Sequence, residues 1–241
     1  MNHAGDDSGI GSFGRTVSHR RLKAIIGTWL TAYDIDEIME RLSEIAPRRS
    51  INCLISCFCH IYPDAAWMAR VAAGRITANL EQSDIESARV IMRRFMWMLN
   101  DESGGIGWGV PEAMAEAVAC SLRLADEYAS LLCSYLLPDM NYLEFPALQQ
   151  GLLWGIGRVA ETRPDLMAET GDALIGFMSS SDPVHRGYAA LAAGRLGVGG
   201  KALEALTGDD SCIMIFMDEQ LMETTVSGLA VAALSRLAVS R

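Results

Sequence analysis

The stretch that decides the fold is SDPVHRGYAALAAGRLG, at residues 181–197 of the 241-residue chain. Its Asp182-Pro183 pair stands where a helix should begin, because proline is tolerated in the first helical turn. Alanine and glycine are frequent after this pair, and small residues suit closely packed helices better than a β-sandwich. The stretch therefore predicts a helix over 183–196.

The same pattern occurs elsewhere in the chain and indicates an internal repeat. Residues 150–158 resemble residues 186–195, about 36–37 residues further on, and each segment ends in a Gly-Arg pair. A third pair, Gly74-Arg75, ends the helical stretch AWMARVAAGR. A period of roughly 33–47 residues with two helices per unit is typical of ankyrin, TPR, HEAT or armadillo arrays. The glycines let stacked helices approach closely.

Apolar residues at helical spacing extend this prediction along the chain. Ile85, Ala88 and Ile91 fall at three-residue steps, which places them on one face of a helix. We expect helices at about 15–31, 34–45, 47–61, 64–79, 84–99, 111–120, 122–136, 146–161, 164–179, 183–196 and 226–239.

One segment departs from the helical pattern. CIMIFMDEQLMETTV (212–226) has two extended pieces on either side of a polar turn, which predicts a β-hairpin. A helix through this segment is the alternative. We expect the hairpin to cap the array before the last helix, because terminal repeats must close an exposed core.

The predicted fold class is therefore all-α, an α-α superhelix (a HEAT-like solenoid) with a short C-terminal β-hairpin at about 212–226. Residues 15–241 form one continuous domain in this interpretation. Residues 1–14 are rich in Gly, Ser and Asp, and we expect a disordered N-terminal tail there.

Composition argues against several classes of function. The formal net charge is −10, whereas a nucleic-acid-binding protein needs a basic stripe to neutralise phosphates. The basic cluster between Arg15 and Lys23 is interpreted as a solvated helix face. We therefore expect no nucleic-acid partner.

Targeting and membrane signals are also missing from the sequence. The first residues, MNHAGDDSG, carry acid where a signal peptide needs a basic start and an apolar run. Apolar stretches such as 51–59 are far shorter than the roughly 18 residues that span a bilayer. We expect a cytoplasmic protein with no membrane partner.

The cysteines do not follow a metal-binding pattern. The chain has six cysteines, and without an export signal we expect reduced thiols. In CLISCFCH, Cys53 and Cys57 would share a helical face, but Cys59 points elsewhere and no CxxC pair is present. We interpret the first two as core residues and expect neither a metal site nor a cofactor.

The loop NDESGGIGWGVP (100–111) is the first candidate site. A Gly-rich loop before a helix can present amide groups to an anion, but the P-loop lysine is missing, and Asp101 and Glu102 would repel a phosphate. One interpretation is an ordered loop in which Trp108 packs inward and Glu112 favours the helix dipole. The other is a binding site, because solenoids place recognition on the loops of one edge.

A second polar group, Asn141, Tyr142 and Glu144, precedes the helix that contains Arg158. Consecutive loops of a solenoid stack on one edge, so we expect this group to converge with Trp108 on one pocket. Two acids in a pocket also suggest general acid–base catalysis, which requires a shifted pKa. The candidate binding residues are Asn100, Asp101, Glu102, Trp108, Glu112, Asn141, Tyr142, Glu144 and Arg158.

Two segments carry a family resemblance. Residues 181–197 resemble a bacterial HEAT repeat of the PBS-lyase HEAT-like kind, through Asp182, Val184, Arg186, the alanine run and Gly194. Residues 92–116, followed by 141–158, are similar to a largely uncharacterised group of bacterial HEAT-repeat proteins. The resemblance implies an α-solenoid in the cytoplasm and implies no reaction.

These patterns lead to two principal hypotheses of function. The first is a non-enzymatic HEAT-repeat scaffold that mediates protein–protein interaction, with another protein or a peptide as partner. The alternative is a helical protein that binds a small molecule or cofactor, as an accessory enzyme, in a pocket between the 100–111 and 139–146 loops. No triad or nucleophile pattern supports catalysis. The acidic charge also argues against DNA repair of the HEAT-like glycosylase type.

Overall fold

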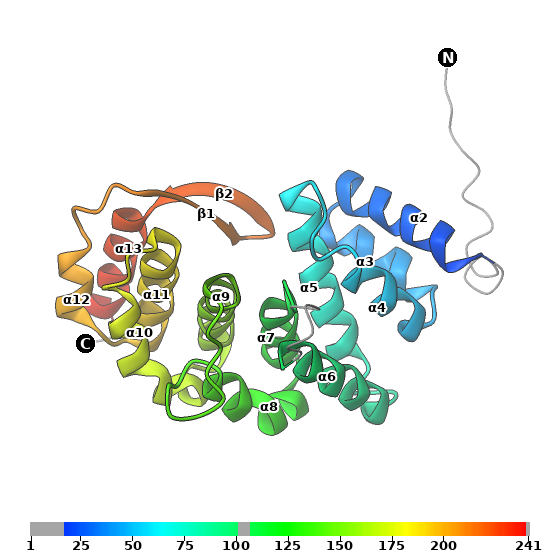
Figure 1. Ribbon diagram of the computed structural model, residues 1–241, viewed down its shortest axis with the longest axis horizontal. Helices are drawn as coiled ribbons and strands as arrows, with labels where there is room; N and C mark the ends of the chain where they lie inside the picture. The colour runs from blue at the N-terminus through cyan, green and yellow to red at the C-terminus, as the bar shows by residue number, and fades with distance from the viewer. Residues whose placement is uncertain (1–16, 101–106, 240–241) are drawn as a thin grey trace, which may run out of the picture.

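Helices with one apolar face make up most of the chain in the computed structural model, which describes residues 17–100 and 107–239. The tail expected at 1–14, and Asp101 and Glu102 of the candidate loop, lie outside these described residues. Five helices pack side by side in chain order and form what we call the inner row (Figure 1). They are α5 (Pro63–Asn79), α7 (Val110–Cys120), α9 (Pro146–Thr162), α11 (Pro183–Leu196) and α13 (Val226–Val239).

A second set of helices packs against the inner row from one side and forms an outer layer. They are α4 (Pro47–Ile55), α6 (Ile85–Leu99), α8 (Leu122–Ser134), the 3-10 helix η1 (Pro164–Thr170), α10 (Gly171–Phe177) and α12 (Gly200–Ala205). Two N-terminal helices, α2 (His19–Ala32) and α3 (Ile35–Ser43), pack on α4 and α5. Alternation of inner and outer helices is the arrangement of an α-solenoid, so the predicted fold class is confirmed.

Glycine and alanine let the inner helices approach one another. A Cβ atom built on Gly194 of α11 would lie 2.4 Å from the Ala233 Cβ and 2.6 Å from its Cα on α13. A Cβ atom on Gly74 of α5 would lie 2.7 Å from the Ala113 carbonyl oxygen of α7. The Gly-Arg pairs of the repeat thus mark the positions where neighbouring helix backbones touch.

Replacing Gly194 with alanine is expected to destabilise the fold by roughly 1–3 kcal/mol, because the added methyl group meets the backbone of α13 and not a flexible side chain. Gly27→Ala on α2 is the matched control. Nothing lies within 4 Å of its added Cβ, so we expect the usual helix gain of up to about 1 kcal/mol. Urea unfolding of both variants measures the difference, and equal stability of the two would contradict close packing at Gly194.

The predicted hairpin is confirmed as β1 (Cys212–Met217) and β2 (Gln220–Thr225), which pair antiparallel from Cys212↔Thr225 to Met217↔Gln220. Its two-residue turn puts Asp218 at φ 50° and Glu219 at φ 63°. Positive φ at both central residues is the type I′ geometry that matches the twist of paired strands. Asp tolerates this region better than Glu does, so the turn is locally strained.

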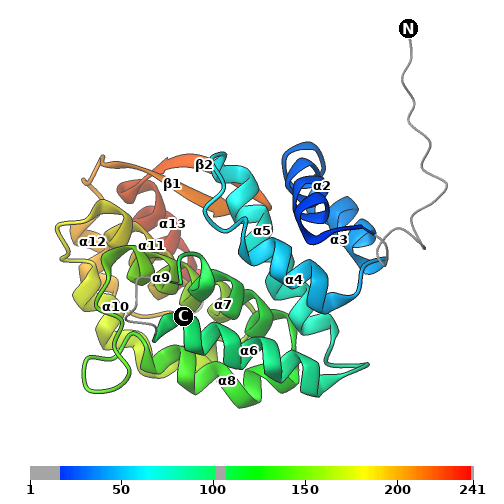
Figure 2. The same ribbon diagram turned by 45° about the vertical axis from the view of Figure 1, so that its right-hand side comes forward.

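The position of the hairpin differs from the expected cap. It does not close the C-terminal end, where α13 packs on α11. It runs back across the inner row as far as α5 (Figures 1 and 2). There the Phe216 ring stacks on Trp67, with ring centroids 5.2 Å apart and an interplanar angle of 6°. The hairpin therefore connects the last third of the chain to the first.

Two predicted helices differ clearly from their expected bounds, and one short helix was not predicted. The helix expected at 47–61 ends at Ile55, because Cys57 and Phe58 form the tighter bonds to residues three positions back that end a helix. The segment 164–179 is a 3-10 helix followed by α10, and the short α12 was not predicted. Short helices carry too few turns for a periodic signal.

Candidate functional site

A buried ion pair connects α5 and α7 beneath the first candidate loop. Arg70 Nη1 donates to Glu112 Oε1 at 3.0 Å, and Arg70 Nη2 donates to the Phe58 carbonyl oxygen at 2.9 Å. The guanidinium also lies over the Trp67 ring, 4.9 Å from its centroid. The Arg70 stem packs on Gly109, where φ is +78° and an added Cβ would lie 2.6 Å from the guanidinium Nε. Arg70 thereby supports the backbone at Gly109, directly after Trp108.

Of the two predicted acids that the structure describes, Glu112 is buried and Glu144 is exposed. The Glu112 side chain is 7% exposed, and its Oε2 atom has no hydrogen-bond partner among residues 17–100 and 107–239. Gly151 of α9 faces this atom, and a Cβ there would lie 2.4 Å from it. Burial raises the pKa of the Glu112 carboxyl, while Arg70 opposes that rise. Glu112 therefore acts inside the helix packing and does not face solvent.

Exposed aromatic side chains precede three inner helices at one edge of the array, which we call the loop edge. Tyr62 precedes α5, Trp108 lies just before α7, and Phe145 precedes α9. Their exposed fractions are 58%, 36% and 53%. The Trp108 and Phe145 rings meet edge to face, with centroids 6.5 Å apart. The structure therefore joins the two candidate loops through an aromatic pair.

The other predicted residues surround this pair or lie apart from it. Gln149 Nε2 donates to the Tyr142 hydroxyl oxygen at 2.9 Å, and Asn141 Nδ2 donates to Ser134 Oγ at 3.0 Å. Glu144 is exposed next to Phe145 in the chain. Asn100 ends α6, and its side-chain amide donates to the Met96 carbonyl oxygen. The hydrogen bonds of Asn141 and Tyr142 hold the 139–146 segment, and that of Asn100 closes the end of α6.

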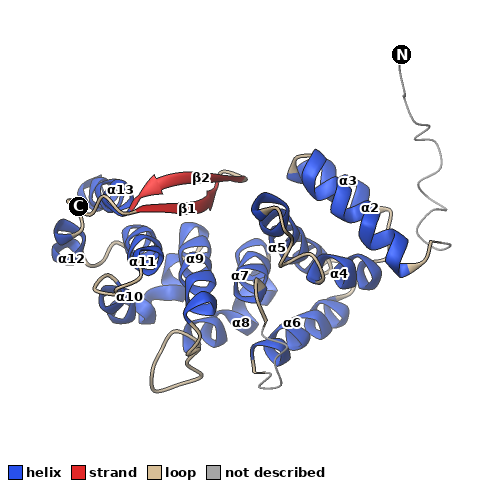
Figure 3. Cartoon of the chain, turned by 45° about the horizontal axis from the view of Figure 1, so that its top comes forward, coloured by secondary structure: helices blue, strands red, loops and turns tan. Residues whose placement is uncertain are grey.

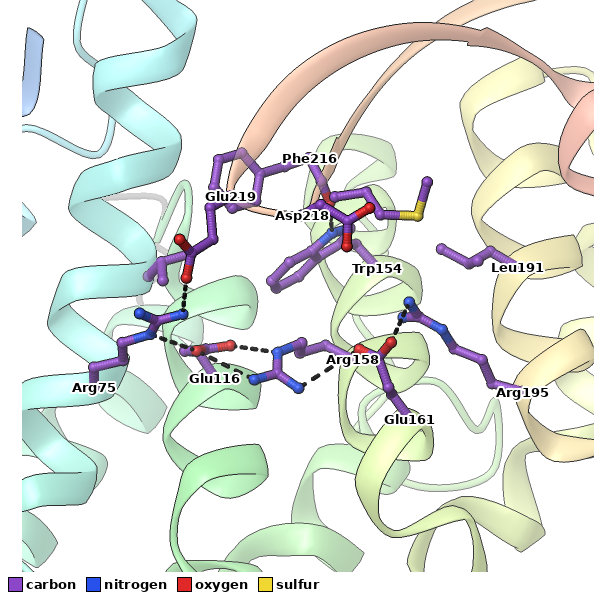
Figure 4. Close-up of a pocket in the computed structure, with 12 residues that line it drawn as sticks. Arg75, Glu116, Trp154, Arg158, Glu161, Leu191, Arg195, Phe216, Asp218 and Glu219 are labelled. Carbon is purple, nitrogen blue, oxygen red and sulfur yellow. Dashed lines mark hydrogen bonds and ion pairs between the residues drawn. The ribbon is translucent and has the colours of Figure 1, made fainter. Parts of the chain in front are cut away.

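Arg158 lies at the other end of α9, in a charged cluster under the hairpin. Arg75 Nε and Arg158 Nε donate to opposite oxygens of Glu116, at 3.2 and 2.7 Å (Figure 4). Arg195 Nη2 donates to Glu161 Oε1 at 3.0 Å. The cluster thus alternates charge across α5, α7, α9 and α11, and it borders a cavity of about 190 Å³.

The hairpin closes this cavity from above. Arg75 Nη2 donates to Glu219 Oε1 at 2.7 Å, and Trp154 Nε1 donates to the Phe216 carbonyl oxygen at 2.8 Å (Figure 4). The charged residues of the cluster occupy equivalent positions of successive repeats. Their spacing is 41, 42 and 37 residues, from Arg75 to Glu116, Arg158 and Arg195. Of this cluster only Arg158 was predicted as a site residue, although the recurring Gly-Arg pairs were the signal that marked Arg75 and Arg195.

A groove of about 520 Å³ lies between the 136–146 loop and the start of α11. Tyr142, Gln149 and His185 line it, and none of the residues 107–111 does. His185 Nε2 lies 2.9 Å from the Pro146 carbonyl oxygen, so it donates there, and His185 Nδ1 then accepts from the Ser180 hydroxyl at 3.2 Å. The groove therefore differs from the pocket expected between the two candidate loops.

Cys53 and Cys57 are buried and Cys59 is exposed. Burial raises the pKa of the Cys53 and Cys57 thiols, which keeps them protonated as core residues. Within residues 17–100 and 107–239, no three His, Cys, Asp or Glu side chains gather closely enough to hold a metal ion. In the same part of the chain, no helix is both long and apolar enough to cross a bilayer.

Stacked helix pairs with equivalent positions about 40 residues apart define an α-solenoid. Two solved structures share this fold: an engineered protein from a structural genomics consortium, and a designed armadillo repeat protein in complex with the peptide (KR)4. The first has a TM-score of 0.56 at 12% identity, over 95% of this chain and 95% of that one. The second has a TM-score of 0.56 at 15% identity, over 95% and 98%.

At these identities the likeness shows the fold alone, an armadillo-like helical repeat. No protein-family model matches the sequence, and no curated protein matches it.

Proposed function

We propose that this protein is a non-enzymatic scaffold that binds a protein partner on its loop edge. The observation that carries the proposal is the exposed Trp108–Phe145 pair, seated on the buried Arg70–Glu112 ion pair. Large aromatic side chains that remain exposed on a rigid base are typical anchors of protein interfaces. A rigid base matters because little conformational entropy is then lost on binding.

The charge of the chain supports a partner with basic groups around its apolar contact. The formal net charge is −10, and Glu144 is exposed directly beside Phe145 in the sequence. Opposite charges at the rim of an interface speed association and reject acidic competitors. The designed armadillo repeat protein, which is in complex with the basic peptide (KR)4, offers a parallel within the same fold.

The type of repeat and the cellular compartment, both predicted from the sequence, are part of the same proposal. We infer that the repeats are of the HEAT-like kind, which residues 181–197 resemble, and that the scaffold works in the cytoplasm. Neither inference changes the predicted contact residues.

Photo-crosslinking tests the loop edge directly. With benzoylphenylalanine at position 108, irradiation in a native extract is expected to yield a discrete crosslinked protein. The matched control is position 97, because Trp97 of α6 is 70% exposed and belongs to the outer layer. Introducing Phe145→Ala and Glu144→Ala into the position-108 protein should reduce the yield tenfold or more. Equal yields at positions 108 and 97 would contradict the proposal.

A second candidate, a small-molecule site, is favoured by the groove at Tyr142 and His185. Its volume of about 520 Å³ lies in the usual range for ligand sites, and it combines apolar walls with a few polar groups. Native mass spectrometry of the protein purified from its own cells tests it. A stoichiometric mass excess that His185→Phe removes would favour this function over the scaffold.

A further inference from the structure

The outer edge of β2 carries backbone groups that the fold leaves unpaired. Met217 and Gln220 flank the two-residue turn, so they form a hydrogen-bonded pair, as such turns require. Pairing alternates along an antiparallel ladder, so the backbone N–H and C=O groups of Leu221 and Glu223 point away from β1. Neither residue has a backbone hydrogen bond to any other described residue.

The opposite edge of the hairpin is already occupied. Tyr188 Oη donates to the Met214 carbonyl oxygen and Trp154 Nε1 donates to the Phe216 carbonyl oxygen, both at 2.8 Å. Ile215 and Phe216, on opposite faces of β1, are both buried, whereas no residue of β2 is fully buried. The β1 edge of the hairpin therefore packs against the inner row, and the β2 edge faces outward (Figure 3).

We propose that β2 accepts an extended basic segment of a partner protein as a third, antiparallel strand. Strand addition uses main-chain hydrogen bonds for affinity and alternate side chains for specificity. This strand edge is a different surface from the loop edge. A test of strand addition therefore neither supports nor contradicts the proposed contact at the loop edge.

The charges around β2 select this occupant. The hairpin contains Asp218, Glu219 and Glu223 and no Lys or Arg. Glu223 is exposed at the middle of the free edge, and no ion pair engages it in the described structure. A lysine or arginine directly opposite it would be favourable, as cross-strand ion pairs are. A second copy of this chain, paired symmetrically about this position, would instead place Glu223 against Glu223, which is destabilising.

The probe is a fluorescein-labelled octapeptide of alternating lysine and valine, titrated into the full chain by fluorescence anisotropy. When a lysine lies opposite Glu223, its own backbone faces β2. N-methylation of the lysine amides is therefore expected to abolish binding, while N-methylation of the valine amides leaves it within about twofold. This pair of peptides separates strand addition from simple attraction between a basic peptide and an acidic protein.

Two substitutions of Glu223 separate the contribution of its backbone N–H to binding from that of its side-chain charge. Glu223→Pro removes the outward N–H together with the carboxylate, at an edge position where a strand tolerates proline, and should weaken binding more than tenfold. Glu223→Gln keeps the N–H and should weaken binding roughly two- to fivefold, the size of a cross-strand ion pair. Unchanged tryptophan emission of Glu223→Pro shows that the hairpin remains in place, because Phe216 of the hairpin packs on Trp67 and Trp154. No binding of the unmodified peptide, equal binding of both methylated peptides, or unweakened binding to Glu223→Pro would overturn the proposal. Self-association in ultracentrifugation that Glu223→Pro abolishes would assign the edge to a second copy and overturn it too.

Discussion

Replacing Arg70 with methionine is expected to destabilise the fold by about 3–5 kcal/mol at neutral pH, because it leaves the Glu112 carboxylate buried without its partner. The Glu112 side chain is only 7% exposed, and its second oxygen already lacks a hydrogen bond to any residue that the structure describes. Methionine retains the apolar stem that packs on Gly109, so the loss reports the charge and its hydrogen bonds. Urea unfolding at pH 7 measures it.

We also expect the Arg70–Glu112 pair to affect how the stability of the fold changes with pH. Burial raises the pKa of Glu112 above its ordinary value of 4.5, so the folded chain holds that proton more tightly than the unfolded chain. The contribution of Glu112 to stability is fully present below pH 4.5 and is lost as the pH rises through the raised pKa. Glu112→Gln should remove this loss, and Arg70→Met should enlarge it.

Arg93→Met on the exposed face of α6 is the matched control, and it should change stability by less than about 0.5 kcal/mol. Unfolding curves collected between pH 4.5 and 8 compare all three variants with the unmodified chain. If Arg70→Met lowered the free energy of unfolding no more than Arg93→Met does, the Arg70–Glu112 pair would not stabilise the fold. The pair could then not serve as a rigid base for the loop edge.

Local pattern was enough to predict the inner row. The Gly-Arg pairs at 74–75, 157–158 and 194–195 predicted three of its helices, because each pair marks a contact between neighbouring helices about one repeat apart. The path of the hairpin was not predictable in this way. It depends on contacts such as Arg75 with Glu219, 144 residues apart, and no local periodicity encodes a partner at that separation.

The candidate site, like the fold, was predictable from the sequence only in part. Stacking of consecutive loops correctly suggested that Trp108 would approach the 139–146 segment, where Phe145 meets it. Arg158 was grouped with them, although the thirteen residues from Phe145 to Arg158 span about 20 Å of helix. The inward direction of Glu112 depends on Arg70 and Gly151 in two other helices, which the sequence around 112 does not contain.

Phe216→Ala is the second change for which we expect a large effect, a loss of about 3–5 kcal/mol. The Phe216 ring is 5% exposed and lies between two tryptophans of different repeats, Trp67 at 5.2 Å and Trp154 at 6.4 Å between centroids. Its removal leaves a cavity where the hairpin meets α5 and α9. Two connections remain at that end: the hydrogen bond from Trp154 Nε1 to the backbone carbonyl oxygen of residue 216, and the Arg75–Glu219 ion pair. The Glu219 carboxylate is 44% exposed, and exposed ion pairs contribute little.

The loss should therefore appear first as release of the hairpin and only then as unfolding of the array. Hydrogen exchange of the β1 amides is expected to accelerate at least a hundredfold in Phe216→Ala, while amides of α7 remain protected, because the inner helices keep their own contacts. Tryptophan fluorescence should shift to the red as Trp67 and Trp154 meet water. Met214→Ala on the same strand, where the side chain is 45% exposed, should leave exchange and emission nearly unchanged. Equal acceleration of β1 and α7 would instead mean that the hairpin and the array unfold as one unit, so that the hairpin is part of the core and not a strap laid across it.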